Sequence, residues 1–175
     1  MSKRLRFSRR LVGLVTGCGL TLLAVPGWGQ TITVVPACGA PGTSAWFDVT
    51  LDPQGHSIAG TQNDILYDST NTPIGECLVN DQLGKGLSWS ALPAGCSGTA
   101  CTSIRAIVLS TDNSAPILSS AVLYRCRIDI PAGTPVNQYG LFNQNASATD
   151  PLTNFEEVTA VTGGIYVGDC SGGGC

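Results

Sequence analysis

Apolar and polar residues alternate in short stretches along most of the chain, from residue 31 onward. One clear stretch covers residues 44–51, with one apolar side formed by Ala45, Phe47, Val49 and Leu51. Trp46, Asp48 and Thr50 form its polar side. A period of two residues sends successive side chains to opposite faces of a β-strand, so this stretch predicts a strand with one buried face.

The strongest alternation lies at residues 122–130, where we expect five side chains to point inward: Val122, Tyr124, Cys126, Ile128 and Ile130. Leu123, Arg125, Arg127 and Asp129 should then face outward. Further strands are expected at 31–35, 58–67, 73–79, 87–92, 103–110, 139–143, 155–161 and 164–167. Gly, Pro, Asn and Asp separate them, and no segment keeps a period of 3.6 residues. The pattern predicts an all-β protein, an antiparallel two-sheet β-sandwich.

The first 29 residues have a different character. Five basic residues lie within positions 3–10, an apolar run follows at 11–25, and Pro26-Gly27-Trp28-Gly29 ends it. This order predicts a signal peptide at 1–29, removed before about Gln30, and therefore a secreted or cell-surface protein. The run is too short for a comfortable transmembrane helix. Lipoprotein anchoring through Cys18 is the minor alternative, because the apolar run continues past that residue.

Charge narrows the range of partners. Residues 30–175 keep four basic side chains (Lys85, Arg105, Arg125, Arg127) against twelve acidic ones, a net charge of −8. This balance argues against nucleic acid and against an anionic membrane as partners. The segment is long enough for one domain, which we place at 30–169, with a Gly/Cys-rich tail at 170–175.

Seven cysteines follow the predicted signal peptide, and in an exported chain they predict disulfides. Cys96 and Cys101 bracket a short flexible loop, and so do Cys170 and Cys175, so each couple is expected to pair. Cys77 with Cys126 is a third candidate, which would close a loop of about 50 residues. One cysteine is left over. With one histidine and no Cys-x-x-Cys, no metal site is predicted.

Candidate catalytic residues are few. His56 lies in a turn, and no Gly-x-Ser-x-Gly nucleophile motif is present. Glu156 and Glu157 are neighbours on a predicted strand, so their carboxylates should point to opposite faces rather than share a glycosidase site. We therefore predict a non-enzymatic protein with no cofactor.

Three segments resemble a known family: WFDVTLDPQGHSIAGTQNDILYD, VLYRCRIDIPAGTPVNQYGLFNQN and GGIYVGD. Over residues 31–169 the chain resembles a cohesin domain, from a branch outside the cellulosome. The resemblance implies a jelly roll of about nine strands and an extracellular, polysaccharide-associated role. It also implies a dockerin as partner, a small calcium-loaded helical domain. Polar residues on the strand matching 60–68 would contact the dockerin; here Gly60 and Gln62 replace the Asn and Asp frequent in scaffoldins.

Four residues are candidates for binding. Gln62 and Asp64 share one side of their strand, and they form part of a docking face or hydrogen-bond a neighbouring loop. Trp46 and Trp89 are either largely buried or offer a platform for a sugar ring. The function predicted is protein docking; direct carbohydrate binding and a structural cell-surface role are the alternatives. The sequence makes no prediction of oligomeric state.

Overall fold

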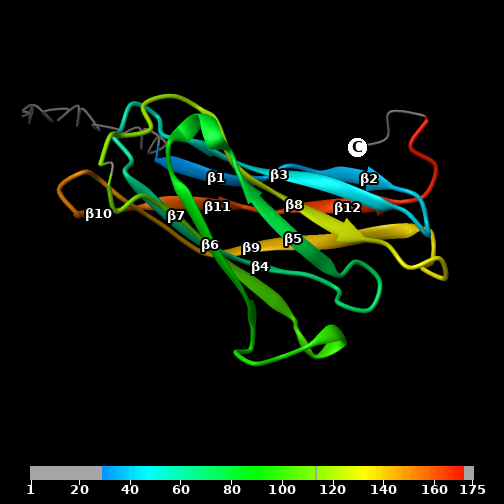
Figure 1. Ribbon diagram of the computed structural model, residues 1–175. Coiled ribbons are helices and arrows are strands. Elements are labelled where there is room, and N and C mark those ends of the chain that lie inside the picture. Colours follow the sequence, from blue (N-terminus) through cyan, green and yellow to red (C-terminus); the bar gives the residue numbers. More distant parts are fainter. Residues whose placement is uncertain (1–28, 113, 172–175) are drawn as a thin grey trace, which may run out of the picture.

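The computed structural model describes residues 29–112 and 114–171, which fold into two curled β-sheets packed face to face (Figure 1). The first sheet has the strand order β11-β1-β3-β8-β5. Its strands are β11 (Val158–Val161), β1 (Gln30–Val34), β3 (Ser44–Asp52), β8 (Ala121–Asp129) and β5 (Ile74–Val79). All neighbours in it are antiparallel except β1 and β11.

The second sheet has the order β2-β12-β9-β4-β7-β6, and β10 pairs with β9 beside it. Its strands are β2 (Ala37–Gly39), β12 (Gly163–Val167), β9 (Asn137–Thr149), β4 (Gly60–Leu66), β7 (Ser103–Leu109), β6 (Gly86–Leu92) and β10 (Phe155–Glu156). Two 3₁₀ turns, Asp81–Leu83 and Gly98–Ala100, complete the elements of residues 29–112 and 114–171. The prediction of an all-β sandwich is confirmed.

Both ends of the domain cross from one sheet to the other. β1 lies in the first sheet and β2 in the second, with Pro36 between them, and β11 and β12 are divided in the same way around Thr162. Proline has no N–H to give to a sheet, so a strand is readily interrupted there. These crossings divide long extended segments into shorter strands. No helix in the described part of the chain is long and apolar enough to span a bilayer.

The core lies between the sheets and follows the predicted alternation on β3. Its four apolar side chains, Ala45 to Leu51, are buried, whereas Trp46 lies on the outer side. On β8 the prediction is wrong at one point: Leu123 is fully buried and Val122 is partly exposed. The pairing shifts there, because Tyr124 is opposite Val49 while Val122 is opposite Thr50. This bulge leaves Leu123 as the extra residue and reverses the alternation.

Three disulfides join cysteines within the described residues. Cys77–Cys126 joins neighbouring strands β5 and β8, and Cys96–Cys101 closes the loop after β6, both as expected. The expected pair Cys170–Cys175 is wrong, because Cys170 bonds to Cys38. The parallel pairing of β2 with β12 sets Tyr166 beside Cys38, which brings the two cysteines together. Cys175, Cys18 and the predicted signal peptide before Gly29 lie outside the described residues.

Candidate functional site

The outer side of strands β9, β4, β7 and β6 carries the predicted residues Gln62 and Asp64. We call this surface the outer face. Antiparallel pairing arranges its side chains in rows across the strands. One row consists of Gln144, Asp64, Arg105 and Ser90, and the next of Ser147, Gln62, Ile107 and Ser88.

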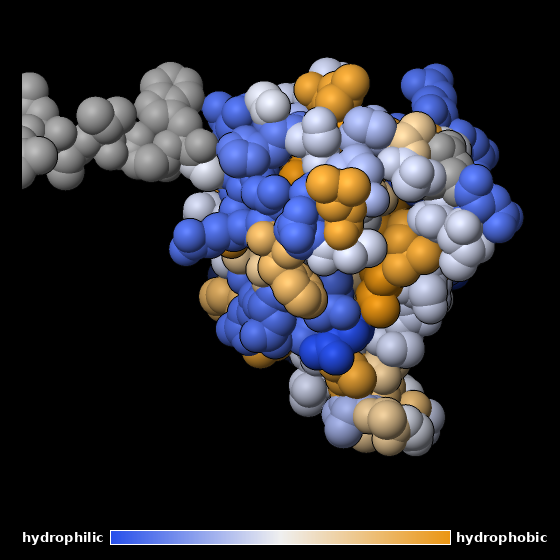
Figure 2. Space-filling model, turned by 90° about the vertical axis from the view of Figure 1, so that its left-hand side faces the viewer, coloured by the Kyte–Doolittle hydropathy of each residue, from blue (hydrophilic) through white to orange (hydrophobic). Residues whose placement is uncertain are grey.

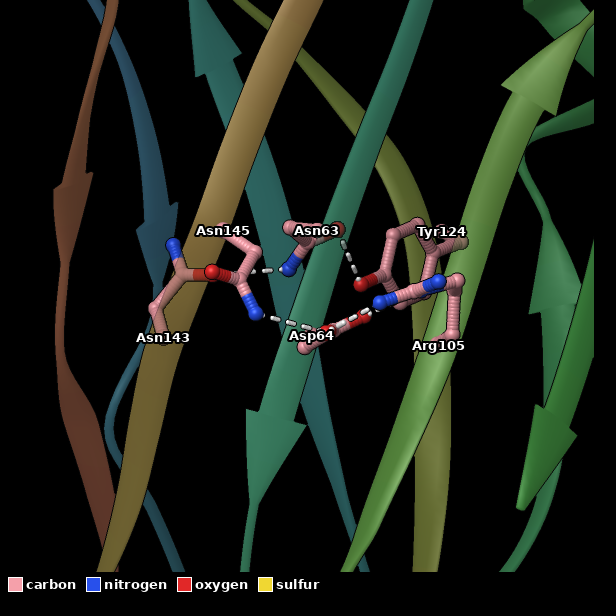
Figure 3. Close-up of polar contacts among 6 residues, drawn as sticks. All are labelled: Asn63, Asp64, Arg105, Tyr124, Asn143 and Asn145. Carbon is pink, nitrogen blue, oxygen red and sulfur yellow. Dashed lines mark hydrogen bonds and ion pairs between the residues drawn. The ribbon is translucent and has the colours of Figure 1, made fainter. Parts of the chain in front are cut away.

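Asp64 and Arg105 form a two-pronged ion pair at the centre of the outer face (Figure 3). Arg105 Nε donates to Asp64 Oδ1 and Nη2 donates to Oδ2, each over 2.7 Å. The Asn145 amide donates to Oδ2 over 2.9 Å. The Asp64 side chain is only 6 % exposed, while that of Arg105 is 41 % exposed. The carboxylate is therefore covered and accepts hydrogen bonds at both oxygens, and it holds the guanidinium in place at the surface.

A bulge on β9 brings Asn145 to this pair. Gln62 is opposite Ser147, whereas Asp64, two residues on, is opposite Gln144, so β9 has one extra residue between these points. Asn145 has a φ of 50°, in the left-handed region that asparagine tolerates better than most residues. The bulge turns its amide toward Asp64.

Electrostatics keep the pair ionised at neutral pH. The hydrogen bond from Arg105 lowers the pKa of Asp64 most, and burial partly opposes it; Asn145 and the charge of Arg105 lower it further. The same pairing raises the pKa of Arg105. The two charges compensate each other, so the outer face offers directed donors rather than a net charge.

The strand β4 is held from its inner side by a buried polar chain. Asn63 is fully buried; its amide donates to Asn143 Oδ1 and its carbonyl accepts from the Tyr124 hydroxyl, both over 2.8 Å (Figure 3). Asn143 in turn donates to the backbone carbonyl of Ile32 over 2.7 Å. Burial raises the pKa of Tyr124 far above its usual range, so its hydroxyl remains a donor. The chain joins β4 and β9 of the second sheet to β8 and β1 of the first.

The structure thus divides the three polar residues of β4. Gln62 and Asp64 share the outer side, as predicted, whereas Asn63 belongs to the core. Sequence reasoning missed Arg105 and Asn145. Arg105 stands as a lone basic residue among apolar neighbours on its strand, which is a sequence feature that could have indicated it.

The two candidate tryptophans belong to different environments. Trp46 lies on the outer side of the first sheet, 36 % exposed, with the Arg125 guanidinium carbon 5.4 Å from its ring centroid. Of the two alternatives for Trp46, the largely buried one is wrong, because more than a third of the residue is exposed. Trp89 faces inward on β6 and packs, partly buried, against the core. The two rings therefore do not form one platform.

His56 contacts Glu156, with its Nδ1 3.3 Å from Oε2, and Glu156 also accepts from the Gln30 amide. His56 is nearly half exposed and closes a β-turn, in which its backbone N–H donates to the Pro53 carbonyl over 2.9 Å. In the described ranges, no three His, Cys, Asp or Glu side chains come together in a way that would hold a metal ion.

No protein-family model and no curated protein matches the sequence. Solved structures do match. A type I cohesin in complex with a dockerin from Clostridium thermocellum superposes with a TM-score of 0.66 at 15% identity, covering 79% of this chain and 99% of that chain. A non-cellulosomal cohesin from Archaeoglobus fulgidus gives 0.64 at 12%, with coverages of 82% and 94%. A type I cohesin from Pseudobacteroides cellulosolvens gives 0.65 at 14%, again with 82% and 94%. The chain has the fold of cohesin domains.

Proposed function

We propose that this chain is a secreted, non-enzymatic docking module that binds a protein partner through its outer face. The observation that carries the proposal is the Asp64–Arg105 pair. It holds an exposed guanidinium in a fixed position on β4 and β7, in the middle of a rigid sheet. An arginine held in place near the centre of an interface is frequently one of the residues that contribute most to binding.

The location of the pair supports this choice of surface. Asp64 lies on the strand where the resemblance to cohesins implies the contacts with dockerin. Several of the similar solved structures are complexes between a cohesin and a dockerin. At Gly60 and Gln62 the chain departs from the scaffoldin residues, so we expect a partner that differs from scaffoldin dockerins. The proposed partner is a calcium-loaded, dockerin-like domain in an extracellular, polysaccharide-associated setting.

A capture experiment tests the proposal. The chain, purified after export, is immobilised and exposed to culture medium of its source organism, with calcium and again with a chelator. A discrete protein should be retained with calcium and lost with chelator. Arg105→Ala should abolish retention, and Leu78→Ala, at an exposed site on the first sheet, should preserve it. If the Arg105→Ala variant retains the protein as well as the original chain does, docking through the outer face is contradicted.

Carbohydrate binding is a second candidate, favoured by one observation. Trp46 exposes part of an indole on the outer side of the first sheet, and Asp48 and Arg125 beside it offer groups that hydrogen-bond hydroxyls. Retention on insoluble cellulose, chitin or xylan tests it. Binding that is lost in Trp46→Ala and kept in Arg105→Ala would establish a glycan site separate from the docking surface; no retention would remove this candidate.

A further inference from the structure

Each sheet ends at strands that have a neighbour on one side only. They are β11 and β5 in the first sheet and β2 and β6 in the second, and β10 beside β9 is a further one. The outward backbone N–H and C=O groups of such an edge strand can pair with a strand of another molecule. Proteins usually block their edges with charges, prolines, bulges or short strands. A long edge strand without such a block is therefore a candidate contact site.

Four of these five edge strands are blocked. β2 has three residues, β10 has two and β11 has four. β5 carries Glu76, and its pairing with β8 is irregular between Ile74 and Glu76. Cys77 of β5 is also bonded to Cys126 of β8. None of the four offers a long, regular and uncharged edge.

The strand β6 differs from the other edges in all these respects. Its seven residues, GLSWSAL, include no charged residue and no proline, and all of them pair with β7 in one unbroken register. Within residues 29–112 and 114–171, no strand pairs with its other side. At about 3.4 Å per residue, the open edge is roughly 24 Å long. β6 therefore has the length and regularity that pairing with another strand requires.

The loop that follows β6 leaves one end of this edge accessible. The loop from Pro93 to Cys101 contains no charged residue, and the Cys96–Cys101 disulfide closes it. Figure 1 shows this loop, in green, projecting below the body of the sandwich. Figure 2 shows the same projection at the bottom of the view, in pale and tan colours without the deep blue of strongly hydrophilic residues. A second molecule can approach here without meeting a like charge.

The side chains of β6 are arranged almost symmetrically around Trp89. Ser88 and Ser90 flank it and lie on the outer side, whereas Leu87 and Ala91 lie on the inner side with Trp89. If a second copy pairs antiparallel with all seven residues overlapping, each Trp89 is opposite the other. Ser88 is then opposite Ser90, and Leu87 is opposite Ala91. In this register polar residues meet polar ones and apolar residues meet apolar ones.

We infer that β6 is an edge for self-association, where two copies of this chain pair their β6 strands antiparallel and form one continuous sheet. A two-fold interface brings the same surface of both copies together, so a strand that reads nearly alike in both directions suits it. Cross-strand serine and aromatic pairs stabilise such pairing. The interface is small, so the dimer is weak and depends on concentration. It leaves both outer faces open and does not depend on the docking function proposed above.

Sedimentation velocity of residues 30–175 tests the inference. Cys175→Ser is introduced in all samples, so that a disulfide between copies cannot produce the dimer. Monomer should convert to dimer over roughly 10–500 µM. Each copy has a net charge of −8, so added salt should increase the dimer fraction. Amide signals of residues 87–91 should shift with concentration, whereas those of β11 should not. A chain that stays monomeric at millimolar concentration, or a dimer with unchanged β6 amides, would overturn the inference.

Two double variants test the register. In Ser88→Lys with Ser90→Glu, each introduced lysine is opposite a glutamate of the other copy, so the dimer should persist. In Ser88→Glu with Ser90→Glu, like charges are opposite each other at two places, and association should weaken at least tenfold. The two variants differ only at residue 88 and have the same side chain opposite Arg105 of β7. Equal dimerisation of the two would contradict the proposed pairing.

Thr159→Glu with Val161→Glu is the matched control. It adds the same two charges at exposed positions of another edge strand, β11, and should dimerise nearly as the original chain does. Urea unfolding verifies that every variant folds. If this control loses the dimer as fully as Ser88→Glu with Ser90→Glu, general charge repulsion is responsible and the inference fails. It also fails if the chain is monomeric and the β6 variant lowers capture of a different protein, because the edge then takes a strand of that partner.

Discussion

Asn63 and Asp64 are neighbours on β4, and both are buried polar residues, yet their side chains lie on opposite sides of the strand. The partners of Asn63 lie on the second sheet and on the first, through Tyr124. Both partners of Asp64 lie within the second sheet, and one of them, Arg105, is open to solvent. The comparison separates a polar cluster that joins the two sheets from one that orients an arginine on the surface of the second sheet.

The physical difference is access to water. Between the sheets a polar atom that loses its partner has no water to replace it, so every member of the inner cluster depends on the others. On the outer face, solvent can reach Arg105 and screens its charge, so the pair adds little to stability. The two clusters should therefore respond differently to the loss of one side chain.

The largest effect is expected from Asn63→Ala. The change leaves the Tyr124 hydroxyl and the Asn143 carbonyl without their partner and opens a small cavity between the sheets. We expect a loss of about 3 kcal/mol in the free energy of unfolding. Urea unfolding with the disulfides intact measures it. A loss below about 1 kcal/mol would mean that the inner cluster does not hold the sheets together.

Tyr124→Phe breaks the same cluster more gently. It removes one hydroxyl and keeps the ring, so only the Asn63 carbonyl loses a donor. The expected loss is about 1–2 kcal/mol in the same urea experiment. Val158→Ala, at a partly buried site on the edge strand β11, controls for the general sensitivity of the first sheet. An unchanged midpoint for Tyr124→Phe would indicate that water replaces the hydroxyl.

Asp64→Asn should lower the free energy of unfolding by about 1 kcal/mol at neutral pH. This figure allows for the exposure of Arg105 to solvent. The pKa of Asp64 is lower in the folded chain than in the unfolded one, so its stabilisation is complete above the unfolded value of about 4. It disappears as the pH falls through the lower, folded pKa. The stability difference between the original chain and the variant should therefore shrink in acid. Urea unfolding at neutral and strongly acidic pH compares them; a difference that grows in acid would contradict the assigned pKa shift.

The sequence allowed one part of this comparison to be predicted. Alternation on a strand is local, so the shared side of Gln62 and Asp64 and the buried side of β3 followed from residue order alone. The residues that bond to Asp64 and Cys170 could not be predicted in this way. Arg105, Asn145 and Cys38 reach their positions through strand pairing between distant segments. Bulges add a second obstacle. The extra residue at Leu123 and the left-handed Asn145 shift the register of their strands. The pattern of apolar and polar residues contains no sign of either shift.

Gln62→Ala is expected to have the smallest effect on stability. It therefore tests most directly whether a residue of the outer face contributes to binding rather than to the fold. Gln62 is partly exposed, and its side chain makes no hydrogen bond to the described residues, so the free energy of unfolding should change by less than about 0.5 kcal/mol. If a partner binds the outer face, the same substitution should still weaken its binding severalfold, because Gln62 lies on that face in the row next to the Asp64–Arg105 pair. Calorimetric titration and urea unfolding on one preparation give both numbers. A stability loss as large as that of Tyr124→Phe, with unchanged affinity, would assign Gln62 to the support of the fold and confine the contact surface to Arg105 and its neighbours.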